Sequence, residues 1–429
     1  MRIKIIKWVV LIVILFILWN WLSGCILFYL ITHHFQSVSP WLYFSVWLHL
    51  YHIANIHHAL MVSGFVSALS LALVFLLLVK EDIPDIYGKA RFANYDDIKK
   101  AGLFGEKGIL LGKIYSTFLR LPGYEHITVF APTGTGKTTG VTVPNLFDWN
   151  ESSVASDIKL QLYNLTSNYK KSQGGKVYLV NWGAQDGTTH CYNPLDMIGD
   201  NPVTRIDELQ KIADIFIPDS TTDKDPWEPQ ARMMFVALAL YVLDTPSIPT
   251  TIAAMVQLFK SQPNFVGFIR HVLATRQDLD PVCVTNFMKL AELDEKIRSS
   301  VTFTFTARFE LFDNPIIVAA TSRSDFDIRH LRREKMHIYV GVTNDNLVRL
   351  SPLLTVFYQQ VADVLTRKLP EKDEPYGVLF LMDEFAALRR MESFHKNIGL
   401  YREYKMRMVL IIQELSQREH YEFLAALLR

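Results

Sequence analysis

Cysteine is scarce in this sequence, since only Cys25, Cys191 and Cys283 occur and no two of them form a C-x-x-C pair. This scarcity excludes a disulfide framework and a zinc site built on paired cysteines, and it suits a reducing compartment. Net charge is low as well, at +1. Residues 1–79 hold three of the 44 basic residues and no acidic one, which leaves 41 basic and 43 acidic residues in the remainder. A near-neutral remainder does not by itself indicate a nucleic-acid binder.

Two long runs lack formal charge altogether. Residues 8–31 form an uncharged run of 24 residues, and residues 59–79 form a second run of 21 residues. At helical rise the first run spans about 36 Å, which exceeds the ~30 Å hydrocarbon core of a bilayer. A cleaved signal peptide has a shorter apolar region and no second span. The two runs therefore predict a transmembrane hairpin over residues 1–80.

The charges beside this hairpin predict its orientation. The loop at 32–58 contains no Lys, Arg, Asp or Glu, whereas basic residues flank both outer ends of the hairpin. Because basic residues are retained on the cytoplasmic side, both ends should face the cytoplasm and the loop should face the periplasm. We expect a multi-pass protein of the bacterial inner membrane, in contact with lipid, with its soluble part in the cytoplasm. The flanking basic residues are Arg2, Lys4, Lys7, Lys80, Lys89 and Arg91.

The loop at 32–58 is rich in histidine and aromatic residues. His49 and His52 could share a helical face and bind a metal or sense pH. A polar and aromatic segment lying at the outer membrane interface is the interpretation that we prefer. The histidines are His33, His34, His49, His52, His57 and His58, and the aromatic residues include Trp41, Tyr43, Trp47 and Tyr51.

The stretch APTGTGKTT, residues 131–139, follows a short apolar stretch and has the pattern of a phosphate-binding loop, except that Ala131 stands where the first glycine is expected. A glycine-rich turn between a strand and a helix can direct backbone N–H groups at phosphate oxygens. Lys137 can reach the β and γ phosphates of ATP, and the Thr138 hydroxyl suits Mg²⁺. A Thr/Gly turn with a chance lysine is the alternative. The predicted nucleotide-binding residues are Thr133, Gly134, Thr135, Gly136, Lys137, Thr138 and Thr139.

The stretch GVLFLMDEF, residues 377–385, is an apolar strand that ends in two acids. Asp383 would join Thr138 in coordinating the metal, and Glu384 would polarise the attacking water. A core strand capped by solvated acids is the alternative interpretation. Asp383 lies 246 residues after Lys137. A compact nucleotide fold does not need that much chain, so a further domain should be inserted between them.

The remaining patterns predict an α/β fold with a parallel sheet. SSVASD and KVYLVNW have the character of strands, and LQLYNLTSNYKK that of a helix. From about residue 200 apolar residues recur at helical spacing, and EPQARMMFVALALYVLD and AELDEKIRSSVTFTFTARFELF are too long for strands. Strand patterns return with MHIYVGV and MRMVLIIQ. We expect a nucleotide-binding domain in two parts, 81–199 and 321–429, around an all-helical domain at 200–320.

Eight short motifs occur in a fixed order: the phosphate loop, DIK, NPLD, DPWEPQAR, SDFDIRHLR, IYVGV, LMDEFAAL and IIQELSQ. In this order the chain resembles the type IV coupling proteins, the inner-membrane ATPases of conjugation and type IV secretion, up to about residue 417. The resemblance implies a RecA-like P-loop NTPase domain with an all-helical insertion, assembled into a homo-hexamer that uses ATP and Mg²⁺. Its implied partners are relaxase-bound DNA, effector proteins and components of the secretion channel.

The resemblance also assigns roles to single residues. Lys137 and Glu384 match the catalytic lysine and the water-activating acid, and Gln413 matches a glutamine that touches the γ-phosphate. Asp157 and Lys159 fall in the family's D-x-K segment, although a surface ion pair at a helix start explains them equally well. A ring ATPase needs a cation from the neighbouring subunit. The sequence does not choose among its candidates, Arg323, Arg329, Arg332, Arg333 and Arg349.

The chain departs from the family at its end. Arg418 replaces an apolar residue, and the sequence stops at Arg429, where members of the family continue. We therefore expect an incomplete second part of the motor, as in a C-terminally truncated member, which binds ATP more readily than it hydrolyses it. Two other functions stay open: a septal-type DNA translocase, against which the long helical insertion argues, and a nucleotide-stabilised membrane recruitment platform without turnover.

Overall fold

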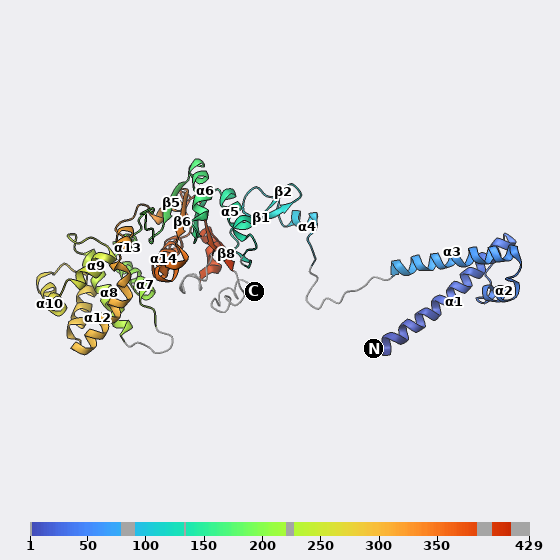
Figure 1. Ribbon diagram of the computed structural model, residues 1–429, viewed down its shortest axis with the longest axis horizontal. Helices are drawn as coiled ribbons and strands as arrows, with labels where there is room; N and C mark the ends of the chain where they lie inside the picture. Colours follow the sequence, from blue (N-terminus) through green and yellow to red (C-terminus); the bar gives the residue numbers. More distant parts are fainter. Residues whose placement is uncertain (1, 79–90, 133, 220–226, 384–396, 413–429) are drawn as a thin grey trace. The chain divides into compact units, whose positions relative to one another are not determined.

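The computed structural model describes residues 2–78, 91–132, 134–219, 227–383 and 397–412. The chain divides into two compact units, residues 1–92 and 93–429, and each is considered by itself (Figure 1). Three of the predicted site residues, Thr133, Glu384 and Gln413, lie outside the described residues.

The first unit is a helical hairpin. Helix α1 (Arg2–Thr32) and helix α3 (Ala54–Leu78) are connected through the short helix α2 (Leu42–Leu50) and pack against each other near it (Figure 1). The segments Val13–Thr32 and Ala54–Leu73 have mean hydropathies of 2.1 and 1.6, and each is long and apolar enough to cross a membrane. The predicted pair of apolar helices is confirmed.

Polar and aromatic contacts join α2 and the two long helices to one another. The Tyr43 hydroxyl of α2 donates a hydrogen bond to the Leu60 carbonyl at 2.8 Å, and the Trp19 indole N–H donates one to the Gly64 carbonyl at 3.0 Å. The Trp19 and Tyr43 rings meet edge to face, with centroids 5.3 Å apart. A side chain at Gly64 would collide with the Tyr43 hydroxyl. The loop between the long helices is thus folded back onto them, with His49 inside α2 and His52 beyond its end.

The second unit is built on a six-stranded parallel sheet with the strand order β3-β8-β7-β4-β6-β5. This confirms the predicted α/β class, and the sequence patterns predicted a strand at each of these six places. The strands are β3 (Ile127–Phe130), β4 (Ser152–Asp157), β5 (Lys176–Val180), β6 (Met336–Gly341), β7 (Val378–Asp383) and β8 (Met406–Ile412).

Helices cover both faces of this sheet, so even β4, whose sequence SSVASD holds three serines, is almost entirely buried. Alternate residues of β4 point to opposite faces: Val154 belongs to a core with Phe357 of α14 (Asn344–Thr366), and Ala155 belongs to a core with Leu146 and Leu162. Leu146 lies on α5 (Val143–Asp148) and Leu162 on α6 (Gln161–Ser172). Helix α14 is drawn on the opposite side of the sheet from α6 in Figure 1.

A small antiparallel hairpin precedes the sheet. It consists of β1 (Ile109–Ile114) and β2 (Thr117–Leu121), and it follows α4 (Tyr95–Lys100). Arg407 of β8 is fully buried and fastens the end of this hairpin to the sheet, because its guanidinium donates to the carbonyls of Leu121, Pro122 and Glu125 at 2.8 to 3.0 Å. The sequence patterns did not predict the hairpin.

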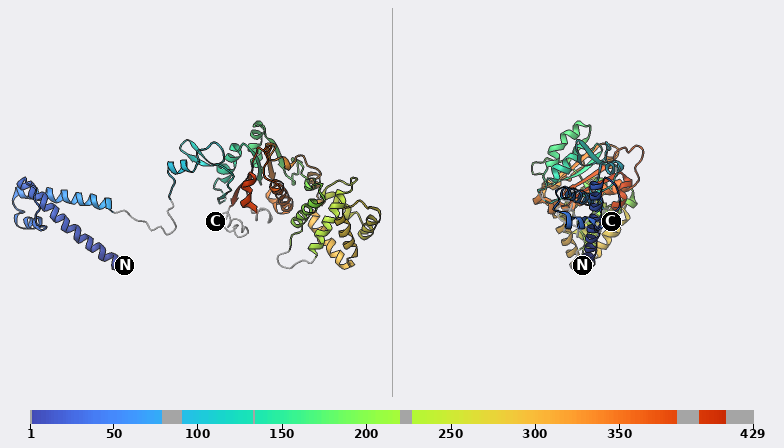
Figure 2. Two further views of the ribbon diagram at one scale, coloured as in Figure 1. Left: turned by 180° about the vertical axis from the view of Figure 1, so that it is seen from behind. Right: turned by 90° about the vertical axis from the view of Figure 1, so that its right-hand side faces the viewer.

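The described residues between β5 and β6 form helices and turns and no strand. Figures 1 and 2 show the larger of these helices gathered at the end of the second unit away from β1 and β2. The α-helices are α7 (Pro202–Phe216), α8 (Glu228–Leu243), α9 (Ile252–Lys260), α10 (Phe265–Thr275), α11 (Pro281–Glu292), α12 (Glu295–Phe309) and α13 (Pro315–Ala320). Short 3-10 turns lie at Pro194–Met197, Glu310–Asp313, Ile328–His330 and Ile398–Tyr404.

The stretch at residues 291–312, which the sequence indicates to be too long for a strand, forms parts of two helices. Helix α11 ends at Glu292 and α12 starts at Glu295, because the backbone of Leu293 and Asp294 is extended. The Arg298 guanidinium donates to the Leu293 carbonyl at 2.7 Å and so satisfies an acceptor at this break. The helical character was therefore predicted correctly, but its interruption was not.

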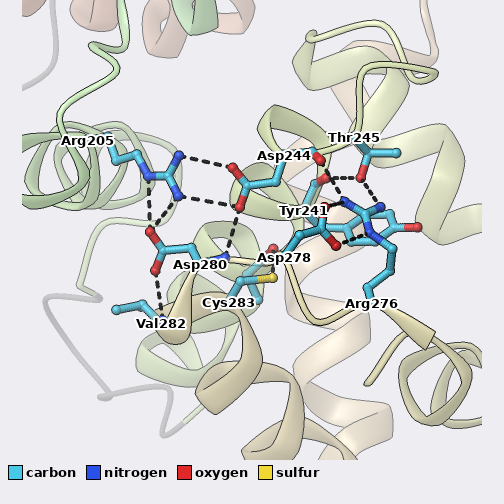
Figure 3. A network of polar contacts seen from close by, with 10 residues as sticks. Arg205, Tyr241, Asp244, Thr245, Arg276, Asp278, Asp280, Val282 and Cys283 are labelled. Carbon is cyan, nitrogen blue, oxygen red and sulfur yellow. Dashed lines mark hydrogen bonds and ion pairs between the residues drawn. The ribbon is translucent and has the colours of Figure 1, made fainter. Parts of the chain in front are cut away.

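A network of charged side chains joins the helices of this region (Figure 3). Arg205 of α7 forms ion pairs with Asp244, which follows α8, at 3.0 Å and with Asp280, which precedes α11, at 2.6 Å. The Asp280 side chain is 3% exposed, and its second oxygen accepts the Val282 backbone N–H at 2.8 Å. One guanidinium thus neutralises two acids from different helices.

Arg276 extends the network (Figure 3). Its guanidinium donates to the Asp244 carbonyl at 2.7 Å and to the Thr245 hydroxyl at 3.0 Å, and it forms an ion pair with Asp278 at 2.6 Å. The same group lies 5.9 Å from the centre of the Tyr241 ring. The turn between α10 and α11 is fixed to the end of α8 in this way.

We expect Arg205→Ala to destabilise the helical region by about 3 kcal/mol, because it leaves two shielded carboxylates without their cation. The matched control is Lys260→Ala, which removes an exposed pair with Asp313 and should cost less than about 1 kcal/mol. Hydrogen exchange of the backbone amides of α8 measures the difference. Equal exchange rates in the two variants would contradict the role given to Arg205.

Candidate nucleotide-binding site

The predicted phosphate loop lies at the carboxyl edge of the sheet. It begins directly after β3, and the Ala131 N–H donates to the carbonyl of Ile412, the last residue of β8, at 3.0 Å. Because all six strands are parallel, the ends of β4 and β7 reach the same edge. Ligands of open α/β sheets bind at this edge.

Two glycines shape the loop. Gly134 and Gly136 have φ angles of +83° and +79°, in the left-handed region that side chains with a β-carbon rarely adopt. A β-carbon at Gly134 would meet nothing within 4 Å, so the glycine is required for its backbone conformation and not for space. The Thr135 hydroxyl donates to the Pro132 carbonyl at 2.8 Å and closes the turn.

A helix starts immediately after the loop. The Gly140 N–H and the Thr139 hydroxyl both donate to the Gly136 carbonyl, at 2.7 and 3.1 Å. Thr138 opens a single π-helical turn, Thr138–Thr142, which continues into α5. The loop therefore has the strand, turn and helix context that the motif requires.

The loop lysine and the strand acid meet at this edge. The Lys137 ammonium lies 4.0 Å from an Asp383 carboxylate oxygen, and the two side chains are 12% and 18% exposed. Strand β8 lies between β3 and β7 and sets this separation. Two charges that are 246 residues apart in the sequence are thereby brought into one site.

Asp157 lies at the end of β4 and is buried, with 2% of its surface exposed. Its carboxylate accepts the Tyr163 N–H of α6 at 2.8 Å and so caps that helix. Burial raises the pKa of Asp157, hydrogen bonds from backbone N–H groups of α6 oppose this, and the charge of Asp383 raises the pKa further. The surface ion pair that we considered for Asp157 and the exposed Lys159 is therefore wrong.

Ser156, next to Asp157, was not among the predicted site residues. Its hydroxyl donates a hydrogen bond to the backbone carbonyl of Asp383 at 2.9 Å. A lone serine at the end of a strand gives no signal in a sequence, because strands that are neighbours in space can be far apart along the chain.

The five candidate arginines have different environments. Arg332 is 4% exposed and forms an ion pair with the buried Glu374 at 3.0 Å, and it also donates to the Leu365 carbonyl, so it holds its own subunit together. Arg349 lines an open cleft between α14 and residues 307–314. The other three are exposed and pair with nearby acids; they are Arg323, Arg329 and Arg333.

The residues of this edge fit a magnesium-bound triphosphate. A loop with two left-handed glycines exposes backbone N–H donors, Lys137 supplies a cation, and the Thr138 hydroxyl and Asp383 carboxylate are the oxygen ligands that Mg²⁺ prefers. Among the described residues no group of three or more His, Cys, Asp or Glu side chains could hold a metal by itself. Metal binding here would therefore depend on the phosphates as further ligands.

The parallel sheet and its loop define a RecA-like P-loop nucleoside triphosphatase fold with a helical insertion. Residues 91–423 match the family described as "Type IV secretory system Conjugative DNA transfer". The chain therefore belongs to this family, the type IV coupling proteins.

Characterised relatives agree with this family. The chain is 33% identical over 343 residues to protein VirD4 of Rhizobium rhizogenes, a match that covers 77% of this chain and 50% of VirD4. It is 24% identical over 370 residues to the conjugal transfer protein TraG of Escherichia coli, covering 77% of this chain and 58% of TraG. The chain thus spans about half the length of the curated relatives that it matches.

Solved structures share the fold. The unbound form of the bacterial conjugative coupling protein TrwB, which lacks its N-terminus, aligns with a TM-score of 0.52 at 16% identity, covering 79% of this chain and 73% of that one. TrwB in complex with the GTP analogue GDPNP aligns with the same TM-score over 80% of this chain and 79% of that one.

We expect Gly136→Ala to weaken binding of a nucleoside triphosphate about fivefold to a hundredfold, because a left-handed residue with a β-carbon costs about 1–3 kcal/mol. Gly140→Ala is the matched control, since φ is not positive there and a β-carbon would meet nothing within 4 Å. Titration with a fluorescent nucleotide analogue measures both affinities. Equal affinities in the two variants would show that the loop conformation does not govern binding.

Proposed function

We propose that this chain is the coupling ATPase of a type IV secretion or conjugation system in the bacterial inner membrane. The observation that carries the proposal is the approach of Lys137 to Asp383 at 4.0 Å, in a chain whose residues 91–423 belong to the coupling-protein family. TrwB, which shares the fold, has been solved with a nucleotide analogue. The family match favours this function over a septal-type translocase.

Hydrolysis in this proposal uses residues from three parts of the chain. Backbone N–H groups of residues 133–139 and the Lys137 ammonium would hold the β and γ phosphates of ATP, and Thr138 and Asp383 would hold Mg²⁺. When bound, the metal would supply positive charge that stabilises the transferring phosphoryl group. Glu384 follows Asp383 directly and orients the attacking water, and Gln413 follows β8 and contacts the γ-phosphate.

Assembly and cargo complete the proposal. A homo-hexamer would let an arginine of one subunit reach the nucleotide of its neighbour, and of the five candidates the buried Arg332 is the least suited. The helical region at 200–320 would select the cargo, relaxase-bound DNA or effector proteins, and the motor would deliver it to the secretion channel. Its place between β5 and β6 supports this division, because it leaves the loop and the acid strand undisturbed.

Two substitutions separate nucleotide binding from turnover. We expect Lys137→Ala to lose ATP affinity and turnover together, and Glu384→Gln to keep ATP bound while hydrolysis slows about 10²- to 10⁴-fold, the usual contribution of a positioned base. Phosphate release by the purified full chain in detergent measures turnover, and cargo transfer between cells measures coupling. Normal transfer by Glu384→Gln would indicate the alternative, a recruitment platform without turnover.

The orientation of the hairpin can be tested separately. The loop at 32–58 should face the periplasm, so a cysteine at Ser45 should react with a membrane-impermeant thiol reagent in cells whose outer membrane has been permeabilised. Cys25→Ser, Cys191→Ser and Cys283→Ser remove the native thiols as background. Labelling only after lysis would overturn this topology.

A further inference from the structure

The backbone pairing at the metal-binding end of β7 is unequal on its two sides. Toward β8 the pairing extends to the last residue, with Asp383 opposite Ile411. Toward β4 it ends two residues earlier, with Ala155 opposite Leu381. On the β4 side Asp383 is held instead by a side chain, the Ser156 hydroxyl that donates to its carbonyl at 2.9 Å.

Helix α14 places a second hydroxyl behind Ser156. Tyr358 is 1% exposed, and its hydroxyl lies next to the Ser156 side chain. Within the described part of the chain this hydroxyl makes no hydrogen bond of good geometry. An enclosed phenol without an acceptor costs free energy, so it should turn toward the nearest lone pair. The Ser156 oxygen offers one, because its own proton is donated to Asp383.

A hydrogen bond donated by Tyr358 to Ser156 would run in the same direction as the bond that Ser156 donates to the Asp383 carbonyl. Each of these two bonds would then polarise the other. The two hydroxyls, Tyr358 and Ser156, lead to the backbone carbonyl of Asp383. The position of this backbone determines where the Asp383 carboxylate points. Side chains of this kind, which do not touch a metal but orient its ligand, typically change metal affinity 10- to 100-fold when they are removed.

We propose that Ser156 is a positioning residue for Asp383, supported from α14 by Tyr358, and that the two hydroxyls aim the Asp383 carboxylate at the Mg²⁺ of the bound nucleotide. This inference rests on the proposed nucleotide site. It assigns a role to Ser156 and Tyr358, which belong to none of the sequence motifs.

The test is the Mg²⁺ dependence of nucleotide binding by the full chain in detergent. A fluorescent non-hydrolysable ATP analogue is titrated at increasing Mg²⁺ and again with EDTA in excess. We expect Ser156→Ala to raise the half-saturating Mg²⁺ concentration about tenfold and Tyr358→Phe to raise it about threefold, with affinity in EDTA unchanged in both. Ser156→Thr keeps the hydroxyl and should restore the wild-type value.

Tyr339→Phe is the matched control. It removes another buried phenol hydroxyl of the same unit. That hydroxyl is hydrogen-bonded to the Thr166 hydroxyl at 2.6 Å and not to Asp383. It should lower stability and leave the half-saturating Mg²⁺ concentration unchanged. An equal shift in Tyr339→Phe, or equal losses with and without Mg²⁺ in Ser156→Ala, would overturn the proposal.

Three further outcomes also decide the question. If Ser156→Ala fails to fold, Tyr358→Phe and Ser156→Thr still decide, since only the former should shift the Mg²⁺ dependence. If wild-type protein shows no Mg²⁺-dependent binding, the proposed nucleotide site itself is wrong. Wild-type dependence that persists unchanged in both Ser156→Ala and Tyr358→Phe refutes only the positioning role.

Discussion

The pairing of β8 between β3 and β7 is the constraint on which the site depends. Strand β3 leads into the phosphate loop and β7 ends at Asp383, and β8 pairs with both. The parallel arrangement brings both ends to one edge, and the 4.0 Å approach of Lys137 to Asp383 follows from it. Strand β8 therefore sets the separation between β3, which leads into the phosphate loop, and β7, which ends at Asp383. A change that displaced β8 would separate the loop at Lys137 from Asp383 without altering either motif.

The same sheet explains how a long helical region can be inserted without disturbing that edge. The chain leaves the sheet after β5 and returns on β6, and these two strands are neighbours that pair along their length. Because the pair is parallel, the insertion leaves at the carboxyl end of β5 and returns at the amino end of β6. Strand β5 is the outermost strand, at the far end of the strand order from β3 and the phosphate loop. Its own cohesion comes from a large apolar core and from Arg205, which neutralises Asp244 and Asp280 where three helices meet. Helix α14 contacts both the insertion and the sheet. Its Asp363 forms an ion pair with Lys211 of α7 at 3.4 Å, and its Tyr358 lies in the core beneath the carboxyl edge of the sheet.

Polar groups have different uses in the two units. In the hairpin, Tyr43 and Trp19 satisfy backbone carbonyls of α3 where no water would compete in a membrane, which stabilises the fold of the loop against the helices. In the second unit, buried polar groups lie at strand ends: Arg407 closes the amino edge, and Asp157 and Ser156 shape the carboxyl edge. Both arrangements follow from the cost of leaving a buried donor or acceptor unsatisfied.

The sequence by itself determined the features that are written in neighbouring residues. Uncharged runs predicted α1 and α3, local strand patterns predicted the six parallel strands, and the loop around Lys137 was recognisable because its glycines, lysine and threonine are adjacent. Local patterns failed where contacts are distant or conformation overrides propensity. They did not predict α14, which contains Pro352, the break between α11 and α12, or the β1–β2 hairpin. Only the tertiary structure decided that Asp157 is buried, that Arg332 is internal, and that Ser156 and Tyr358 lie behind Asp383. The reason is that strand order, which no single strand encodes, places these residues side by side.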